Sequence, residues 1–216
     1  MAKLLWHQCL TPPLWLAIYC AIASIVSFIG AADFWTWLFE LWVGFVAVIL
    51  LVVTYKRFPF SNLVYWIVAV HFTVFAIAAH YTYAGFPLFN WLKDTFHLSR
   101  NHFDRVGHFL QGFTPALLAR EMLLRRTQLK SSRLVGFLCF SIAGAITAIW
   151  EILEAYTVIF FYKTAGPEWL GWQGDIWDAQ NDMLACLVGA TIAMVLFAKL
   201  HDRSMQKAIK KERAIW

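Results

Sequence analysis

The chain has 216 residues, of which 61% are hydrophobic and only 14% are charged, and its formal net charge is +5. Soluble globular domains are about 45–50% apolar and about a quarter charged. The composition therefore argues against a cytosolic enzyme, a disordered chain and a nucleic-acid-binding protein, and it predicts an all-α protein embedded in lipid.

Six segments are long and apolar enough to cross a membrane, since about 20 helical residues cover a hydrocarbon core of roughly 30 Å. In chain order they are residues 12–30, 36–55, 62–83, 103–124, 134–161 and 178–198. Short polar stretches separate them, and a basic tail follows at residues 199–216. The sequence thus predicts one transmembrane helical domain, residues 1–216, with six spans.

The basic residues favour an even number of spans, because cytoplasmic loops are enriched in Lys and Arg. With six spans, all but four of the 18 basic residues fall on the side of the two termini. The exceptions are Lys93, Arg100, Arg105 and Lys163. We therefore predict that both termini are cytoplasmic.

The first segment has a second interpretation as a secretory signal. Lys3 precedes an apolar run that ends in the small residues Gly30, Ala31 and Ala32, which is a pattern that signal peptides share. The run is long for a signal, and this favours a retained helix.

Small residues predict where two of the spans pack. Ala185, Gly189 and Ala193 recur every four residues in the last segment, and the fifth segment contains Gly144 and Ala148. Small faces allow helix backbones to approach closely in lipid. We therefore expect the fifth and sixth segments to pack tightly against each other.

Ionisable residues inside the predicted spans concentrate in the second half of the chain. A charged side chain at the centre of a membrane costs about 2.5–3.5 kcal/mol on insertion scales, so each one indicates a functional site. Asp104, His108 and Gln111 share one helical face because they are spaced i, i+4 and i+7. Glu151 and Glu154 form a carboxylate pair at i, i+3 in the fifth segment.

The last segment begins in an acidic stretch, in which Gln173 and Asp175 precede Asp178 and Asp182. With six spans, this stretch lies at the same end of the bundle as the two groups just described. The sequence therefore predicts a polar site near the outer leaflet. Three histidines of the same region, His80, His97 and His102, are further candidates for it.

Carboxylates and imidazoles gathered in this way suit two chemistries. They can bind Zn²⁺, Mn²⁺ or Fe, or they can act as general acid and base. The candidate catalytic residues, which are also the candidate metal ligands, are Asp104, His108, Glu151, Asp178 and Asp182. The secondary candidates are Gln111, Glu154, Gln173, Asp175 and His102. No compact metal motif such as H-E-x-x-H is present, so the cofactor stays open, with a divalent metal as one candidate.

Structural roles explain some of these residues equally well. Asp175 and Asn101 are each as well explained as helix caps, and His108 as a packing histidine hydrogen-bonded to a glutamate of the fifth segment. The whole cluster could be a stabilising polar network. Glu40 and His71 lie on other segments and are interpreted as isolated hydrogen-bonded residues.

At these motifs the chain resembles the YjdF-type inner-membrane proteins, a bacterial family of small polytopic proteins without an assigned activity. The resemblance rests on Arg100-Asn101-His102-Phe103-Asp104-Arg105, Gly107-His108-Phe109, Gln111-Gly112-Phe113, Arg120-Glu121, Trp150-Glu151-Ile152-Leu153-Glu154, Gln173-Gly174-Asp175, Trp177-Asp178 and Asp182-Met183. It covers most of the chain and implies a multi-pass protein of the bacterial inner (plasma) membrane.

The chain also resembles, more distantly, the VanZ-type membrane proteins, some of which are linked to glycopeptide-antibiotic tolerance. The shared pattern is Asp104, His108, Glu151, Asp178 and Gly189-Ala190. That family usually has an Arg just before its last acidic group and an Asn in its final helix. Here Gln173-Gly174-Asp175 and Asp182 occupy those places.

Two classes of function fit the predicted site. The first is an enzyme, metal-dependent or acid/base, that acts on a lipid or lipid-linked envelope substrate. The alternative is a non-catalytic transporter or a factor that binds lipid or antibiotic. Few polar residues lie in the inner halves of the last three segments before the Arg120-Glu121 pair, which weighs against transport. The expected partners are membrane lipid and a lipid-linked or small-molecule substrate, with no nucleic acid, and the oligomeric state is left open.

Overall fold

The computed structural model describes residues 11–161 and 173–213, and within these ranges the regular secondary structure is entirely helical. The helices are α1 (Pro12–Phe28), α2 (Phe34–Thr54), α3 (Asn62–Tyr81), α4 (Pro87–Thr95), α5 (Phe103–Arg126), α6 (Arg133–Phe161), α8 (Asp178–Val195) and α9 (Ala198–Arg213). The all-α prediction is confirmed, and each of the six predicted segments is a helix whose ends lie within three residues of the predicted ends. Lys3 and Lys163 lie outside the described residues.

By length and composition alone, fewer than the six predicted segments qualify as membrane spans. Helices α2, α3 and α6 each meet both requirements. The pair α8 and α9 would make a fourth span if it is counted as one helix bent by 64°. Helix α1 is apolar but has only 17 residues, and α5 contains the charged residues Asp104, Arg105, Arg120 and Glu121. The described residues therefore contain three or four helices that could cross a membrane by these two criteria.

Short polar residues set several helix ends. Asp33 Oδ2 accepts the backbone N–H of Thr36 at 2.7 Å and so caps the start of α2. Pro87 begins α4, where the missing N–H of proline costs nothing. Asn101 Oδ1 accepts the N–H of Phe103, the first residue of α5, at 2.9 Å. Asn101 thus satisfies the first N–H of α5, but the N-cap residue itself is His102, whose side chain makes no capping bond.

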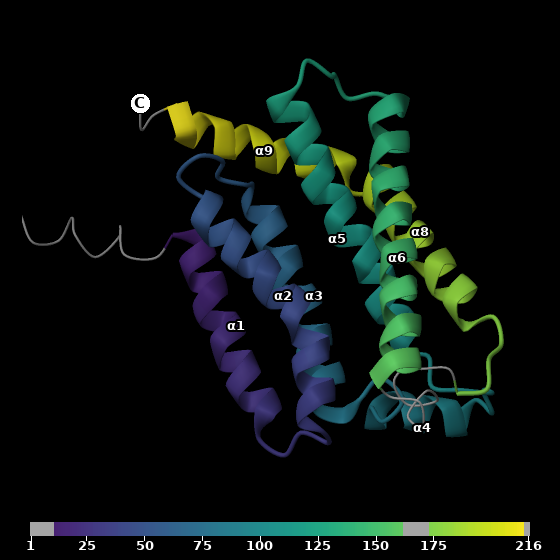
Figure 1. Cartoon of the computed structure of the whole chain (residues 1–216). Helices are drawn as coiled ribbons and strands as arrows, with labels where there is room; N and C mark the ends of the chain where they lie inside the picture. The colour runs from purple at the N-terminus through teal and green to yellow at the C-terminus, as the bar shows by residue number, and fades with distance from the viewer. Residues whose placement is uncertain (1–10, 162–172, 214–216) are drawn as a thin grey trace, which may run out of the picture.

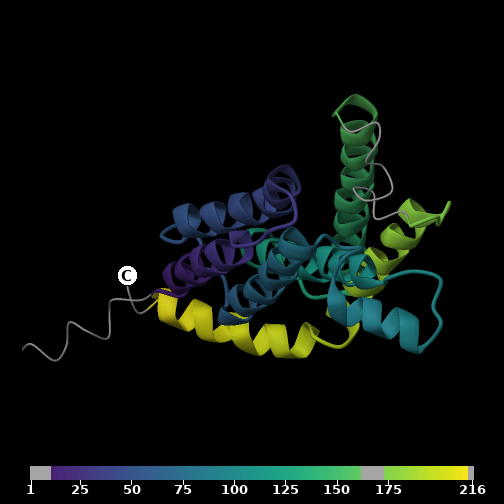
Figure 2. The same cartoon turned by 90° about the horizontal axis from the view of Figure 1, so that it is seen from below.

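The helices form two groups of three that lie side by side, α1 to α3 in one and α5, α6 and α8 in the other (Figures 1 and 2). Each group has its own apolar core. The first surrounds the fully buried side chains of Tyr65 and Phe72 on α3. The second surrounds Leu117 of α5, Cys139 of α6 and Cys186 of α8. Contacts between α3 and α5 join the two groups.

The small residues of α8 face α5 more closely than they face α6. A Cβ atom at Gly189 would lie 2.0 Å from the carbonyl oxygen of Phe109, and one at Gly112 would lie 1.8 Å from that of Cys186. These backbones therefore approach so closely that only glycine fits. The expected contact between α6 and α8 is present, but the closest approach is made by α5, which brings Asp104 and His108 toward the start of α8.

Two further helices, which the sequence did not predict, lie across opposite ends of the bundle (Figure 1). Helix α4 lies where α5 begins, and Asn101 Nδ2 donates to Asn90 Oδ1 of α4 at 2.9 Å. Helix α9 lies where α5 ends. His201 of α9 is fully buried and its Nε2 lies 2.9 Å from Glu121 Oε2 of α5. The segment predicted as a basic tail is therefore helical to Arg213 and docked on the bundle.

Candidate functional site

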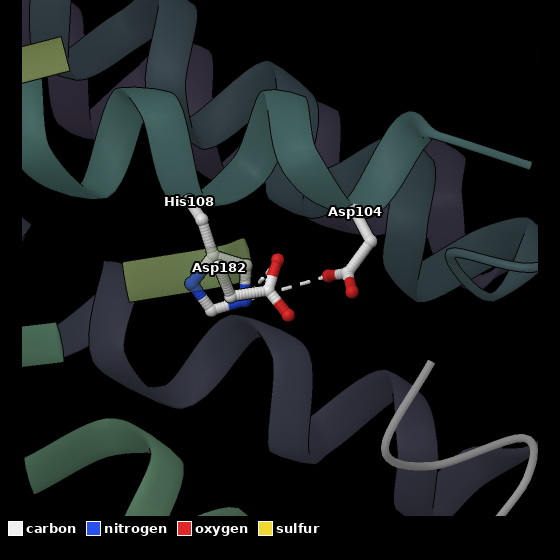
Figure 3. Close-up of side chains that lie close together, drawn as sticks. All are labelled: Asp104, His108 and Asp182. Atoms are coloured by element: carbon white, nitrogen blue, oxygen red, sulfur yellow. Dashed lines mark ion pairs between the residues drawn. The ribbon is translucent and has the colours of Figure 1, made fainter. Parts of the chain in front are cut away.

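Three of the predicted site residues meet in the interior, where α5 lies against α8. Asp104 and His108 come from α5 and Asp182 comes from α8, and all three are buried (Figure 3). His108 Nε2 lies 3.5 Å from Asp104 Oδ1 and 3.6 Å from Asp182 Oδ1. Both distances exceed the 2.7–3.2 Å of an ordinary hydrogen bond. The three groups are therefore gathered around a common point at ion-pair distances that are longer than ordinary hydrogen bonds.

The other side of the same imidazole faces α6. His108 Nδ1 lies 2.9 Å from Gln111 Oε1 and 3.5 Å from Glu151 Oε1. Ligand atoms of His108, Glu151 and Glu154 all lie within 4.8 Å of one another, as do those of Asp104, His108 and Asp182. His108 is therefore shared by two groups that could each hold a cation, and both predicted glutamates lie in the same cluster as His108.

Two arginines that the sequence did not place in the site neutralise part of it. Asp178 forms ion pairs with Arg100 and, at 2.6 Å, with Arg105. Arg105 also pairs with Asp182, and both guanidinium groups lie 3.6–3.7 Å from Asp104. Asp178 is thus engaged by arginine rather than directed at His108. The sequence did contain a sign of this role. Arg100 and Arg105 are two of the four basic residues that do not fall on the side of the termini.

The loop before α8 contributes contacts rather than ligands. Asp175 Oδ1 accepts the N–H of Trp177 at 2.9 Å, and Asp175 Oδ2 lies 3.1 Å from Arg105. Hydrogen bonds from Trp177 and Asn181 hold the pKa of Asp175 below its usual value. Gln173 binds Asn101 twice, accepting its N–H at 2.9 Å and donating to its carbonyl at 3.0 Å. These bonds tie the start of α8 to the start of α5.

The three outer histidines do not meet at His108. His102 is the N-cap residue of α5, where partial burial and the two nearby guanidinium groups lower its pKa. His80 Nδ1 instead pairs with the carbonyl of Ser27 at 3.0 Å. His97 is exposed, in a left-handed conformation with φ of 53°.

A cavity of about 280 Å³ lies between the two helix groups and ends at the polar cluster. Side chains of α2, α3, α5 and α6 line it, and most of them are apolar, for example Val43, Ala47, Val68, Leu118, Ile149 and Leu153. His108, Gln111 and Glu154 line its polar end. From His108 to Leu118 the lining follows α5 for ten residues, or about 15 Å.

The cavity brings in residues that sequence reasoning had set aside. His71 lines it together with His108, and His71 Nε2 is buried without a hydrogen-bond partner. Tyr83 also lines it, with its ring packed against Gly107. Glu40 is buried close enough to Asp104 and His108 to interact with them electrostatically. The interpretation of Glu40 and His71 as isolated residues is thus wrong; no local pattern marks them, since only packing brings their helices to α5.

The site holds more acidic than basic groups. Two guanidinium groups and two imidazoles, those of His71 and His108, face seven carboxyl groups, which are Glu40, Asp104, Glu151, Glu154, Asp175, Asp178 and Asp182. An uncompensated buried charge is costly. Protons or a bound cation can supply positive charge here, as in the acid/base and metal chemistries that the residue types favour.

Comparison with known proteins agrees with the membrane character of the chain. Residues 12–203 match the family of predicted membrane proteins known as DUF2238. The chain is 35% identical over 191 residues to the inner membrane protein YjdF of Escherichia coli (strain K12), a match that covers 88% of this chain and 91% of that protein. No solved structure shows a significant match. With several apolar helices long enough to cross a membrane, the protein is a multi-pass inner-membrane protein, and it belongs to the DUF2238 family of predicted membrane proteins.

Proposed function

We propose that the chain crosses the membrane six times, with both termini in the cytoplasm and the His108 cluster near the outer leaflet. The concentration of Lys and Arg at one end of the bundle supports this orientation. Alkaline phosphatase fused after Asp94 should be active, because it would lie outside the cytoplasm, and the same fusion after Ser131 should be inactive. The reverse pattern would contradict the orientation.

We further propose that the protein is an enzyme acting on a lipid or a lipid-linked envelope substrate. The observation that carries this proposal is the apolar cavity that His108, Gln111 and Glu154 line at its polar end. Its length along α5, about 15 Å, is half of a hydrocarbon core of roughly 30 Å. That depth suits one apolar chain from a single leaflet, with the polar part of the molecule against His108.

Acid/base or metal-assisted hydrolysis or group transfer is the chemistry that this polar end can support. His108 and Glu154 line the cavity and so can reach a bound molecule, while Glu151 lies against His108 from the side of α6. In this proposal His108 and Glu154 exchange protons with the substrate, or His108 holds a metal ion that activates water. Asp178 does not act on the substrate in this proposal, because it forms ion pairs with Arg100 and Arg105.

Transport is less well supported by the same geometry. Beyond Thr114 the cavity lining along α5 consists of Pro115 and Leu118, and the next polar groups are those of the buried network around Glu121. A hydrophilic solute would find no polar partner over that distance. A protein that binds lipid without altering it is the remaining alternative, and the experiment below distinguishes such binding from turnover.

The test uses purified protein in lipid nanodiscs made from an extract of bacterial envelope lipids. Mass spectrometry of the lipids before and after incubation should show that one lipid class is consumed by the native protein. His108→Ala and Glu154→Gln should each lower this rate at least a hundredfold, while the exposed-residue control His97→Asn should leave it unchanged. A lipid that is retained but never altered would support the binding function instead, and neither retention nor turnover would refute both.

A further inference from the structure

We propose that Asp104, His108 and Asp182 together bind one divalent transition-metal ion, with His108 coordinating through Nε2 and Gln111 positioning the imidazole. The proposal names the cofactor of the site described above, and its catalytic meaning rests on the proposed function. Ion binding itself needs no lipid substrate, so it can be tested separately.

The spacing of the three ligands is that of a coordination site. Two ligand atoms about 2.1 Å from a tetrahedral ion lie roughly 3.4 Å apart. His108 Nε2 lies 3.5 Å from Asp104 Oδ1 and 3.6 Å from Asp182 Oδ1. The same distances are too long for hydrogen bonds. Figure 3 shows both carboxylates directed at the same side of the imidazole ring.

Gln111 selects the nitrogen that is free to coordinate. Its Oε1 can only accept, so at 2.9 Å it takes the proton of His108 Nδ1. In the neutral imidazole Nε2 is then unprotonated and directs its lone pair at Asp104 and Asp182. Metal-binding histidines commonly donate their second N–H to an oxygen in this way, which fixes the ring orientation.

Asp182 Oδ1 is the ligand atom that would have to exchange partners. Its side chain is 2% exposed, and Oδ1 forms an ion pair with Arg105 Nη1 while lying 3.6 Å from His108 Nε2. Arg105 already contacts Asp178 at 2.6 Å and Asp175 at 3.1 Å through its other terminal nitrogen. Only Nη1 would have to withdraw from Asp182 when an ion binds.

The group formed by His108, Glu151 and Glu154 fits an ion less well. It would use His108 Nδ1, whose proton is donated to Gln111. Both glutamates are also less buried than Asp104 and Asp182. Asp104, His108 and Asp182 therefore form the better site for Zn²⁺ or a similar ion. They supply two carboxylates and one imidazole, and they leave coordination positions of the ion open.

Calorimetric titration of metal-free, detergent-purified protein with Zn²⁺ tests the proposal. The native protein should bind one equivalent. Asp182→Asn should weaken binding at least a hundredfold, and Gln111→Leu, which keeps all three ligands, should weaken it about 10- to 100-fold. Glu154→Gln and His97→Asn should bind as the native protein does.

Several results would overturn the proposal. These are an absence of binding by native protein that elutes as a single folded species, unchanged binding in Asp182→Asn, or an equal loss in Glu154→Gln. If Asp182→Asn does not fold, Gln111→Leu decides the question. Lipid retention measured on the same samples distinguishes failure of the metal site from failure of the proposed function, because the cavity holds its ligand by apolar contact.

Discussion

Replacing Ala47 with Phe should block the cavity and leave the polar cluster untouched. Ala47 lines the cavity from α2, on the helix group opposite His108. An added ring at this position would project into the space between the two groups. The variant therefore separates occupation of the apolar cavity from the chemistry of its polar end.

The size of the effect follows from the cavity volume. An apolar cavity of about 150 Å³ is known to hold a benzene molecule, so one phenyl ring removes about half of the roughly 280 Å³ available here. A chain that fills the native cavity would then lose about half of its contacts. We expect retention of the bound lipid to fall at least tenfold, equivalent to about 1.4 kcal/mol.

Mass spectrometry of lipids that remain with the protein after detergent exchange measures this retention. The matched control is Val46→Phe, one residue earlier on α2, where the side chain is 45% exposed and faces away from the bundle interior. Val46→Phe should retain lipid as the native protein does, and both variants should bind Zn²⁺ equally. Equal retention by Ala47→Phe and the native protein would refute the assignment of the cavity to an apolar chain.

Three further variants test other parts of the structure. Gly189→Ala should lower stability by about 1–3 kcal/mol or more, because its Cβ would lie 2.0 Å from a carbonyl oxygen, whereas Gly136→Ala meets no atom within 4 Å and should be neutral or slightly stabilising in thermal unfolding. Glu121→Gln removes the buried carboxylate charge that pairs with Arg125 at 2.5 Å and with His201 of α9 at 2.9 Å, so it should cost about 3–5 kcal/mol and expose α9 to trypsin; unaltered digestion would contradict this role. Arg105→Gln removes the charge that pairs with Asp182, so added Zn²⁺ should raise its melting temperature more than that of the native protein, and an equal rise would count against competition between arginine and ion.

Local sequence patterns predicted the helices well because they depend on neighbouring residues alone. Hydropathy placed the segments that became α1, α2, α3, α5, α6 and α8 to within three residues at each end. Helix α4 is short and amphipathic, with Leu88 and Trp91 exposed beside polar neighbours, and α9 is strongly basic. Neither contains a long apolar run, so a search for membrane spans could not find them.

The core of the candidate site was also predictable, but its surroundings were not. Asp104, His108 and Gln111 lie on one face of α5 because helical periodicity requires it. The ion pairs of Asp178 with Arg100 and Arg105 depend on the position of α8 beside α5, which no local pattern in the sequence reveals. His71 reaches the site only because α3 packs against α5.

The sequence by itself determined that this chain is a helical membrane protein and that its rare charged residues include a candidate site. Only the tertiary structure decided which helices meet, because lipid provides no hydrophobic force to select one apolar partner over another. The choice falls to the close packing of α5 on α8, where Gly112 lies against the carbonyl of Cys186 and Gly189 against that of Phe109. That contact sets Asp182 beside His108, and the space left between the two helix groups forms the cavity that ends there.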